Sequence, residues 1–299
     1  MRQRSLVKRL WEILGPLILV RIIAFIVQFI VISIYSFRRM PEYIIDNTFS
    51  QEQITELTME IMEGVYPYLT EIAALSALVA IPFLLVMMRR DYKKEQLAGI
   101  VQNKKASLTK YVLVLGISIP FSLGLNNILL LSNLAEYSEA YQQAAESLYT
   151  PSLPVQIVCV GMIIPIMEEL VFRGLIYKRM RRNATFFRAA MYSCLFFGFY
   201  HGNAVQFIYA VLCGLLLAYL YEKYGSLKAP VLAHMCMNIV SCVLTEADVF
   251  TWMFSRTIRM AVITTACAAL ASAMFVLIRQ IEERADLVSE KEESQDVVN

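Results

Sequence analysis

The segment VQIVCVGMIIPIMEELVFRG, residues 155–174, carries two adjacent carboxylates and an arginine at the end of an apolar run. The run from Val155 to Met167 is apolar enough to enter a lipid bilayer, yet Glu168, Glu169 and Arg173 follow it directly. A charged side chain at the centre of a membrane-spanning helix costs roughly 2.5–3.5 kcal/mol on insertion scales. Charged groups kept at that depth therefore indicate a functional site inside the membrane.

The composition is that of an integral membrane protein. Of the 299 residues, 58% are hydrophobic and 17% are charged, against about 45–50% and about 25% in ordinary soluble domains. The formal net charge of +2 provides no bulk attraction to nucleic acid. We therefore expect the lipid bilayer as the environment and no nucleic-acid partner.

The six cysteines all lie in apolar stretches, and none forms a C-x-x-C pair. Cysteines in such positions are typically small apolar fillers of helix interfaces. We expect neither a disulfide framework nor a thiolate metal site.

Eight apolar runs predict an all-α, polytopic membrane protein with about eight transmembrane helices. The runs begin and end near residues 13–35, 69–88, 111–134, 153–167, 186–200, 205–221, 229–244 and 258–278. We interpret the chain as one polytopic unit in three segments: residues 1–152 with three helices, residues 153–245 with helices four to seven, and residues 246–299 with the last helix and a charged tail. Residues 38–68 are a polar segment, and residues 246–256 are expected to be a loop.

Basic and acidic loops alternate along the chain. The positive-inside rule, which counts lysine and arginine in short loops, places both termini in the cytoplasm. It places the basic segments 89–110, 178–188 and 222–228 on the same side. This assignment is self-consistent for eight helices.

The spacing of the charges in the opening segment predicts different roles for the two glutamates. Glu169 and Arg173 are four residues apart, so on an α-helix they share a face and can neutralise each other. Glu168 is rotated by about 100° from Glu169 and is left in apolar surroundings, where a carboxylate can act as a general base. The alternative is that all three charges form a buried network that only fixes helix packing.

The chain contains only two histidines, His201 and His234, and each has a partner four residues away, Phe197 and Asn238 respectively. Water attack on a carbonyl needs a base, a proton shuttle and donors that stabilise an oxyanion. A carboxylate, an imidazole and a His–Asn donor pair supply these groups. Taken singly, each histidine could also be structural, and the His–Asn pair could be a polar clasp between helices.

These groups can meet only if they lie at similar depths in the membrane. A helix that starts at Phe186 places His201 about 22 Å along it, at about 1.5 Å per residue, whereas His234 lies near the start of the seventh helix. We therefore expect the fourth helix to continue to about Lys178 and the seventh to begin near Ser226.

Three motifs in order resemble the CAAX-protease and bacteriocin-processing family, the intramembrane glutamic endopeptidases that include type II CAAX prenyl proteases. They are E-E-L-V-F-R-G (168–174), F-x-x-x-H (197–201) and G-S-L-K-A-P-V-L-A-H-x-x-x-N (225–238). Each motif is weak alone, but the ordered set is specific. The resemblance covers about residues 155–245.

The resemblance implies a role for each candidate residue. Glu168 would activate water, Glu169 and Arg173 would support it, and His201 would join in proton transfer. The donors His234 and Asn238 would bind the oxyanion. The family also implies hydrolysis without a cofactor, a peptide or membrane-protein substrate such as a prenylated CAAX protein or a precursor peptide, and a multi-pass location that we expect to be a bacterial cell membrane.

Other functions stay open at this point. Glu168, His201 and His234 could bind zinc and leave a position for water, although the chain has neither H-E-x-x-H nor H-x-x-E-H. A non-catalytic scaffold or a bacteriocin self-immunity protein could use the same fold. A transporter is disfavoured because interrupted helices in paired halves are not evident. The motifs do not identify the substrate or the oligomeric state.

Overall fold

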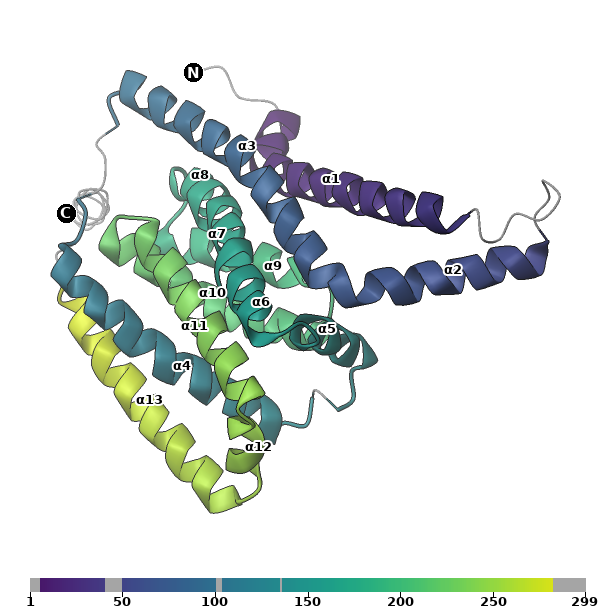
Figure 1. The fold of residues 1–299 in the computed structure, drawn as a ribbon. Helices are drawn as coiled ribbons and strands as arrows, with labels where there is room; N and C mark the ends of the chain where they lie inside the picture. Colours follow the sequence, from purple (N-terminus) through teal and green to yellow (C-terminus); the bar gives the residue numbers. More distant parts are fainter. Residues whose placement is uncertain (1–5, 41–49, 101–103, 135, 282–299) are drawn as a thin grey trace.

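A continuous helical rod from Leu153 to Arg181 runs near the centre of the fold, and several of the other long helices pack directly against it (Figure 1). The computed structural model describes residues 6–40, 50–100, 104–134 and 136–281. The basic residues before Leu6, part of the acidic segment near Glu42 and the charged tail after Ile281 lie outside the described residues.

The α-helices are α1 (Leu6–Arg39), α2 (Gln51–Val65), α3 (Leu69–Leu97), α4 (Val112–Leu131), α5 (Glu139–Tyr149), α6 (Leu153–Val158), α7 (Ile164–Glu169), α8 (Lys178–Arg181), α9 (Phe186–Tyr200), α10 (Ala204–Tyr224), α11 (Lys228–Glu246), α12 (Val249–Phe254) and α13 (Thr257–Arg279). Two π-helical segments, η4 (Cys159–Ile163) and η5 (Leu170–Tyr177), join α6, α7 and α8 into the central rod. Short 3₁₀ turns, η2 (Tyr66–Tyr68) and η3 (Leu108–Tyr111), precede α3 and α4.

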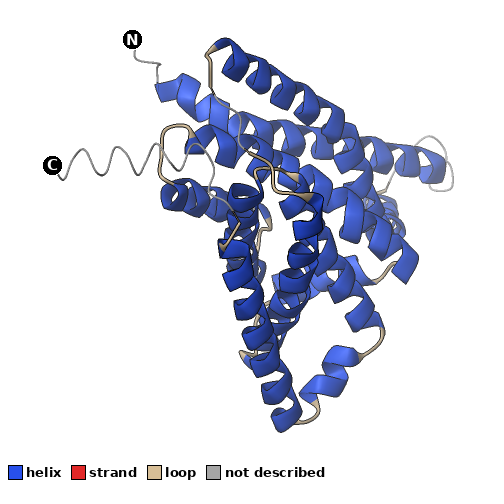
Figure 2. Cartoon of the chain, turned by 90° about the vertical axis from the view of Figure 1, so that its left-hand side faces the viewer, coloured by secondary structure: helices blue, strands red, loops and turns tan. Residues whose placement is uncertain are grey.

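The described residues form helices and connecting turns without any strand (Figure 2). Seven helical segments within them are long and apolar enough to cross a membrane, which confirms an all-α, multi-pass integral membrane protein. The remaining expected span, Phe186–Tyr200, is a helix of 15 residues. At about 1.5 Å per residue it is shorter than the roughly 30 Å hydrocarbon core of a bilayer.

Several polar segments that the sequence suggested as connections are helical. The segment 38–68 contains α2, which begins with a capping box: the Gln53 N–H donates to the Ser50 hydroxyl, and the Ser50 N–H donates to the Gln53 side chain. The interpretation of residues 246–256 as a loop is wrong, because α12 forms within it. The capping box of α2 is a local signal that marks the start of a helix.

The predicted extensions of two helices are confirmed. The central rod continues beyond Lys178 to Arg181, and α11 begins at Lys228, close to the expected Ser226. One apolar cluster holds the rod in place and includes Leu84 of α3, Phe172 of η5 and Phe197 of α9. A second cluster joins α4, α10, α11 and α13 to one another.

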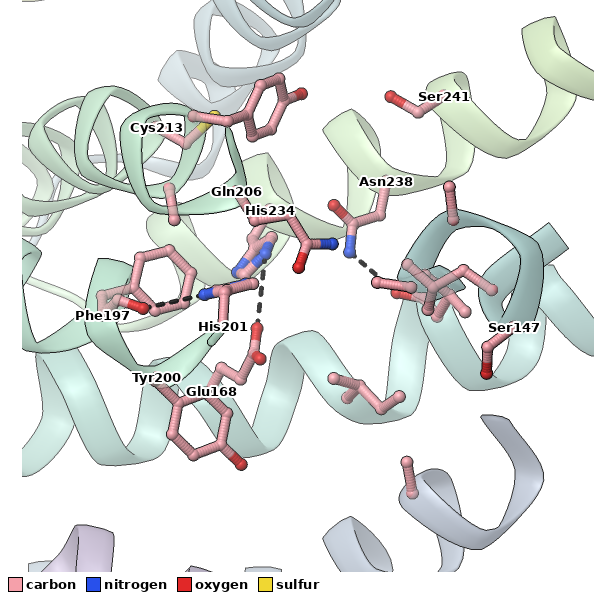
Figure 3. Close-up of a pocket in the computed structure, with 18 of the residues that line it drawn as sticks. Ser147, Glu168, Phe197, Tyr200, His201, Gln206, Cys213, His234, Asn238 and Ser241 are labelled. Carbon is pink, nitrogen blue, oxygen red and sulfur yellow. Dashed lines mark hydrogen bonds and ion pairs between the residues drawn. The ribbon is translucent and has the colours of Figure 1, made fainter. Parts of the chain in front are cut away.

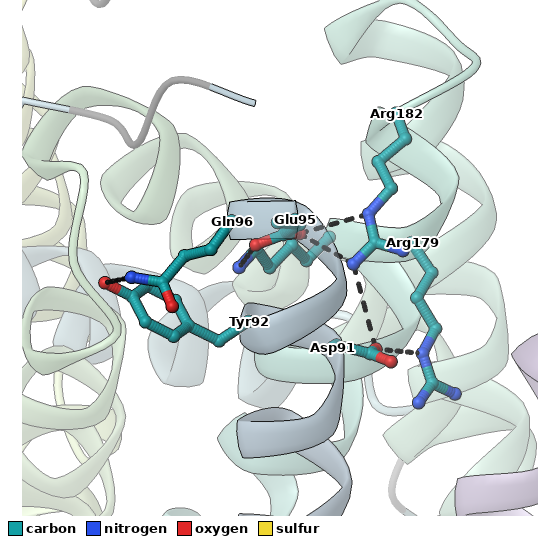
Figure 4. Close-up of polar contacts among 7 residues, drawn as sticks. Asp91, Tyr92, Glu95, Gln96, Arg179 and Arg182 are labelled. Atoms are coloured by element: carbon teal, nitrogen blue, oxygen red, sulfur yellow. Dashed lines mark hydrogen bonds and ion pairs between the residues drawn. The ribbon is translucent and has the colours of Figure 1, made fainter. Parts of the chain in front are cut away.

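Helix α3 extends past its apolar part because ion pairs tie it to the end of the central rod (Figure 4). Asp91 accepts from the Arg179 Nε at 2.6 Å, and Glu95 accepts from Lys178 Nζ at 2.7 Å and from Arg182 Nη2 at 2.6 Å. Both acidic residues are buried. The sequence prediction that residues 89–110 form a loop is therefore wrong for residues 89–97, which are helical.

The basic segments converge at one end of the bundle. The Ala106 N–H donates to the Tyr224 carbonyl at 3.0 Å, and Lys223 Nζ donates to the Arg279 carbonyl at 3.1 Å. The Arg179 guanidinium donates to the carbonyl of Glu12. The basic segments therefore lie on a common side, as the positive-inside rule requires, and the assignment of that side to the cytoplasm stays a prediction.

We predict that Glu95→Ala lowers the free energy of unfolding by roughly 1.5–3 kcal/mol, the range for hydrogen bonds to charged groups. The loss follows because Lys178 and Arg182 both lose a buried acceptor. Denaturant titration in detergent, followed by thiol labelling of the five buried free cysteines, measures this change. Glu56→Ala, at an exposed position of α2, is the matched control and should stay within about 0.5 kcal/mol of the wild type.

Candidate active site

A cavity of about 480 Å³ lies inside the bundle, and four of the six candidate residues line it (Figure 3). These four are Glu168, His201, His234 and Asn238. They come from α7, the end of α9, and α11. Pockets of about 300–1,000 Å³ are the usual size for ligand sites, so this cavity can hold a few residues of a peptide.

Glu169 and Arg173 lie behind the cavity wall and are fully buried. Arg173 Nη1 donates to Glu169 Oε1 at 2.7 Å, which confirms the pairing that the spacing predicts. Arg173 Nη2 also donates to the Gly214 carbonyl at 3.1 Å. A methyl group at Gly214 would lie only 3.1 Å from the guanidinium, so the glycine allows α10 to approach this closely.

His234 joins the two glutamates, a contact that the sequence did not predict. Its Nδ1 lies 2.9 Å from Glu169 Oε1, and its Nε2 lies 3.6 Å from Glu168 Oε2. Because the Glu169 carboxylate can only accept, Nδ1 carries the proton in this contact. Nε2 is therefore the nitrogen that can exchange a proton on the cavity side, next to Glu168.

His201 is held in a defined tautomer by the backbone. Its Nδ1 lies 2.8 Å from the Phe197 carbonyl oxygen, and a carbonyl can only accept, so Nδ1–H is the donor. The neutral ring then has an unprotonated Nε2. This orientation suits a histidine that takes up a proton.

Phe197 packs against three members of the site. Its ring is edge-on to His201, with ring centroids 4.8 Å apart, and to His234 at 5.7 Å. The Arg173 guanidinium carbon lies 4.7 Å from the ring centroid. This one buried ring therefore links the packing of the two cavity histidines to that of the buried arginine.

Asn238 donates a hydrogen bond to a backbone carbonyl that has no backbone donor within the central rod. In the π-helical segment η4, the Ile164 N–H bonds to Cys159 instead of to Val160. The next residue, Pro165, has no N–H to donate. The Val160 carbonyl instead accepts from Asn238 Nδ2 at 2.9 Å, so one N–H of this side chain has a structural role.

Helix α5 covers one side of the cavity. More than half of its residues line the cavity wall, namely Tyr141, Ala144, Ala145, Ser147, Leu148 and Tyr149. The Thr70 hydroxyl anchors α5 by donating to the Ser147 carbonyl at 2.7 Å. Burial raises the pKa of Tyr149 to about 12, so its hydroxyl stays neutral at physiological pH.

The sequence prediction missed several polar residues of the cavity wall, among them Arg21, Tyr200, Gln206, Tyr209 and Ser241. Arg21 was visible as an interruption of an apolar run. Gln206 was not noticed, although a polar residue near the start of the apolar run 205–221 was a signal that could have pointed to it. Tyrosine and serine within apolar helices gave no signal, because both are common in packed membrane helices.

The described residues contain no group of three or more His, Cys, Asp or Glu side chains placed to hold a metal ion. Three candidate zinc ligands, Glu168, His201 and His234, all line the cavity. One nitrogen of each histidine is already hydrogen-bonded to Phe197 or to Glu169.

The part of the chain that carries the three motifs matches a known protein family. Residues 150–240 match the family model described as "Type II CAAX prenyl endopeptidase Rce1-like". In this region the chain is similar to the CAAX-protease family. The match confirms the resemblance that the three motifs carry, and it includes every candidate site residue.

A curated protein of Bacillus subtilis (strain 168), described as "Putative membrane peptidase YdiL", is 29% identical over 87 residues. That alignment covers 29% of this chain and 36% of the relative, so the chain spans about a third of the relative's length. No solved structure matches this chain. The family match is thus confined to residues 150–240, and α1–α5, α12 and α13 lie outside it.

We predict that Asn238→Ala lowers the free energy of unfolding by about 1–3 kcal/mol, because the half-buried Val160 carbonyl loses its donor. The effect should be smaller in a Pro165→Ala background, because the backbone N–H restored at position 165 can donate a hydrogen bond to the Val160 carbonyl. A double-mutant cycle by denaturant titration should give a coupling of roughly 0.5–3 kcal/mol between the two sites.

Pro82→Ala combined with Asn238→Ala is the control for this cycle, because Pro82 interrupts the hydrogen bonds of a different helix, α3. Additive effects of Pro165 and Asn238 would contradict the capping role of Asn238.

Proposed function

We propose that this chain is an intramembrane endopeptidase that hydrolyses a peptide bond with water activated by Glu168. One observation carries the proposal: Glu168 faces a cavity inside the membrane bundle together with His201, while its neighbour Glu169 is neutralised by Arg173 behind the wall. Similarity of residues 150–240 to the CAAX-protease family supports the same reaction.

The first step is proton removal from water by the Glu168 carboxylate as the water oxygen attacks the carbonyl carbon of the substrate. The carbonyl oxygen becomes an oxyanion. His234, held by Glu169 through Nδ1, directs its Nε2 toward Glu168. When this nitrogen is protonated, it can donate to Glu168 or to the oxyanion.

The second step breaks the carbon–nitrogen bond of the tetrahedral intermediate. The leaving nitrogen must gain a proton, and Glu168 can return the one that it took from water, either directly or through His201, whose free Nε2 first accepts that proton and then donates it. The two products are a new carboxyl terminus and a new amino terminus. The reaction proposed here uses no cofactor, and every proton moves between groups of this chain and the substrate.

The charge of the buried groups suits this reaction. Two carboxylates and one guanidinium leave one net negative charge when His234 is neutral, and none when it is protonated. Proton uptake by His234 therefore neutralises the cluster, and the low-dielectric surroundings strengthen each of these interactions. A peptide or membrane-protein substrate is expected, since the cavity opens among membrane helices.

We predict that Glu168→Gln and His201→Ala each lower the rate of cleavage by roughly 10²–10⁴-fold, the usual contribution of a general acid or base. Comparative peptidomics of membranes that contain the wild type or a variant identifies the cleaved peptides and measures their loss. Glu246→Gln, at an exposed position, is the matched control and should leave the peptides unchanged.

If Glu168→Gln and His201→Ala both produce the wild-type peptides at wild-type rates, the chain is not a glutamate peptidase. A scaffold or immunity role on the same fold would then explain the match to the family.

We predict that EDTA and 1,10-phenanthroline do not inhibit the purified protein, because the proposed base acts directly on water. The measurement is the cleavage rate of a synthetic peptide that spans an identified site, with and without chelator. Inhibition that added zinc reverses would instead support metal ligation by Glu168, His201 and His234.

A further inference from the structure

Gln206 faces the cavity from the first turn of α10, and its neighbour Asn203 fixes the orientation of its side chain. Asn203 is the N-cap of α10, and its Oδ1 accepts from the Gln206 backbone N–H at 2.8 Å. Its Nδ2 donates to Gln206 Oε1 at 2.7 Å. The two side chains therefore form a closed pair at the helix start, directly after His201 and Gly202.

The chemistry of this pair identifies every oxygen and nitrogen atom in it. A backbone N–H can only donate, so the Asn203 atom that it reaches must be the oxygen. The other Asn203 atom is then the NH₂ group, and its partner on Gln206 must be an oxygen. Gln206 Nε2 is consequently the atom turned away from Asn203.

Both N–H groups of Gln206 Nε2 lack a hydrogen-bond partner among the residues that the structure describes. Figure 3 shows the side chain extending into the cavity between the histidines and Asn238. The other candidate donors are partly engaged. Asn238 uses one N–H for the Val160 carbonyl, and His234 uses Nδ1–H for Glu169.

We propose that Gln206 is a further catalytic residue, whose carboxamide N–H groups bind the carbonyl oxygen of the scissile peptide and stabilise its oxyanion. Donors held in place before the reaction stabilise developing charge without reorganisation. Asn203 is a positioning residue in this arrangement, because it holds Gln206 Oε1 and so turns the donors toward the substrate.

This inference rests on the proposed peptidase activity, so its test starts from a synthetic peptide that the wild type cleaves and Glu168→Gln does not. Gln206→Met keeps the side-chain length but removes both donors. We expect kcat to fall by about 10²–10³-fold, as for loss of one oxyanion donor, with KM changed less than about threefold. Gln206→Glu keeps the acceptor for Asn203 and should lower kcat similarly.

Asn203→Asp tests the positioning role separately. A carboxylate at position 203 still caps α10, but it cannot donate to Gln206 Oε1, so the carboxamide should rotate and direct its N–H groups away from the cavity. We expect a fall in kcat with little change in the unfolding transition. Gln96→Ala, at an exposed position of α3, is the control and should retain wild-type kcat.

The outcomes separate the two proposals. If Gln206→Met and Gln206→Glu retain wild-type kcat while Glu168→Gln is inactive, the role of Gln206 is disproved and the peptidase stands. A rise in KM at constant kcat would also overturn it, because that result assigns Gln206 to ground-state binding. If Glu168→Gln is fully active, the peptidase proposal itself fails.

Discussion

The carboxylate of Glu169 is the contact on which the centre of this molecule depends. It binds a guanidinium from its own helix and an imidazole from α11, in a part of the bundle that excludes water. Removing one partner from such a buried group leaves an uncompensated charge, which costs far more than a surface ion pair contributes. The same contact fixes the height of α11 against the central rod and selects the nitrogen of His234 that meets Glu168. Packing and chemistry are therefore set by a single side chain that never touches the cavity.

Features that depend on near neighbours in the chain could be predicted from the sequence. Apolar runs gave the membrane helices, since the bilayer requires about 20 apolar residues for each span. A spacing of four gave the Glu169–Arg173 pair and thereby separated its role from that of Glu168. The motifs gave the residues of the cavity wall on α7, α9 and α11. In each case the information lies within a few helical turns.

Features that depend on contacts between distant segments could not be predicted in this way. The extension of α3 to Leu97 depends on basic residues of α8, more than 80 positions away. The engagement of Asn238 depends on a carbonyl freed by a proline in another helix. The apolar residues Tyr141, Ala144, Ala145 and Leu148 stand at helical spacing in α5, but the position of this helix over the cavity depends on distant contacts such as that of the Thr70 hydroxyl with the Ser147 carbonyl. The sequence alone therefore does not show which distant residues these side chains contact, and those contacts determine the role of each side chain.

The two π-helical segments give the central rod a property that hydropathy does not record. A π-helical turn accommodates one more residue than an α-helical turn, so η4 and η5 set the angular phase of Glu168 and Glu169 against the helix on either side. Loss of one residue from the α-helical segment α6, before η4, would leave the rod long and apolar enough to cross the bilayer. It would also rotate everything beyond the deletion by about 100° and direct the carboxylates into different neighbours. The number of residues in this helix is thus constrained by the direction in which its side chains must point, and not only by the thickness of the bilayer.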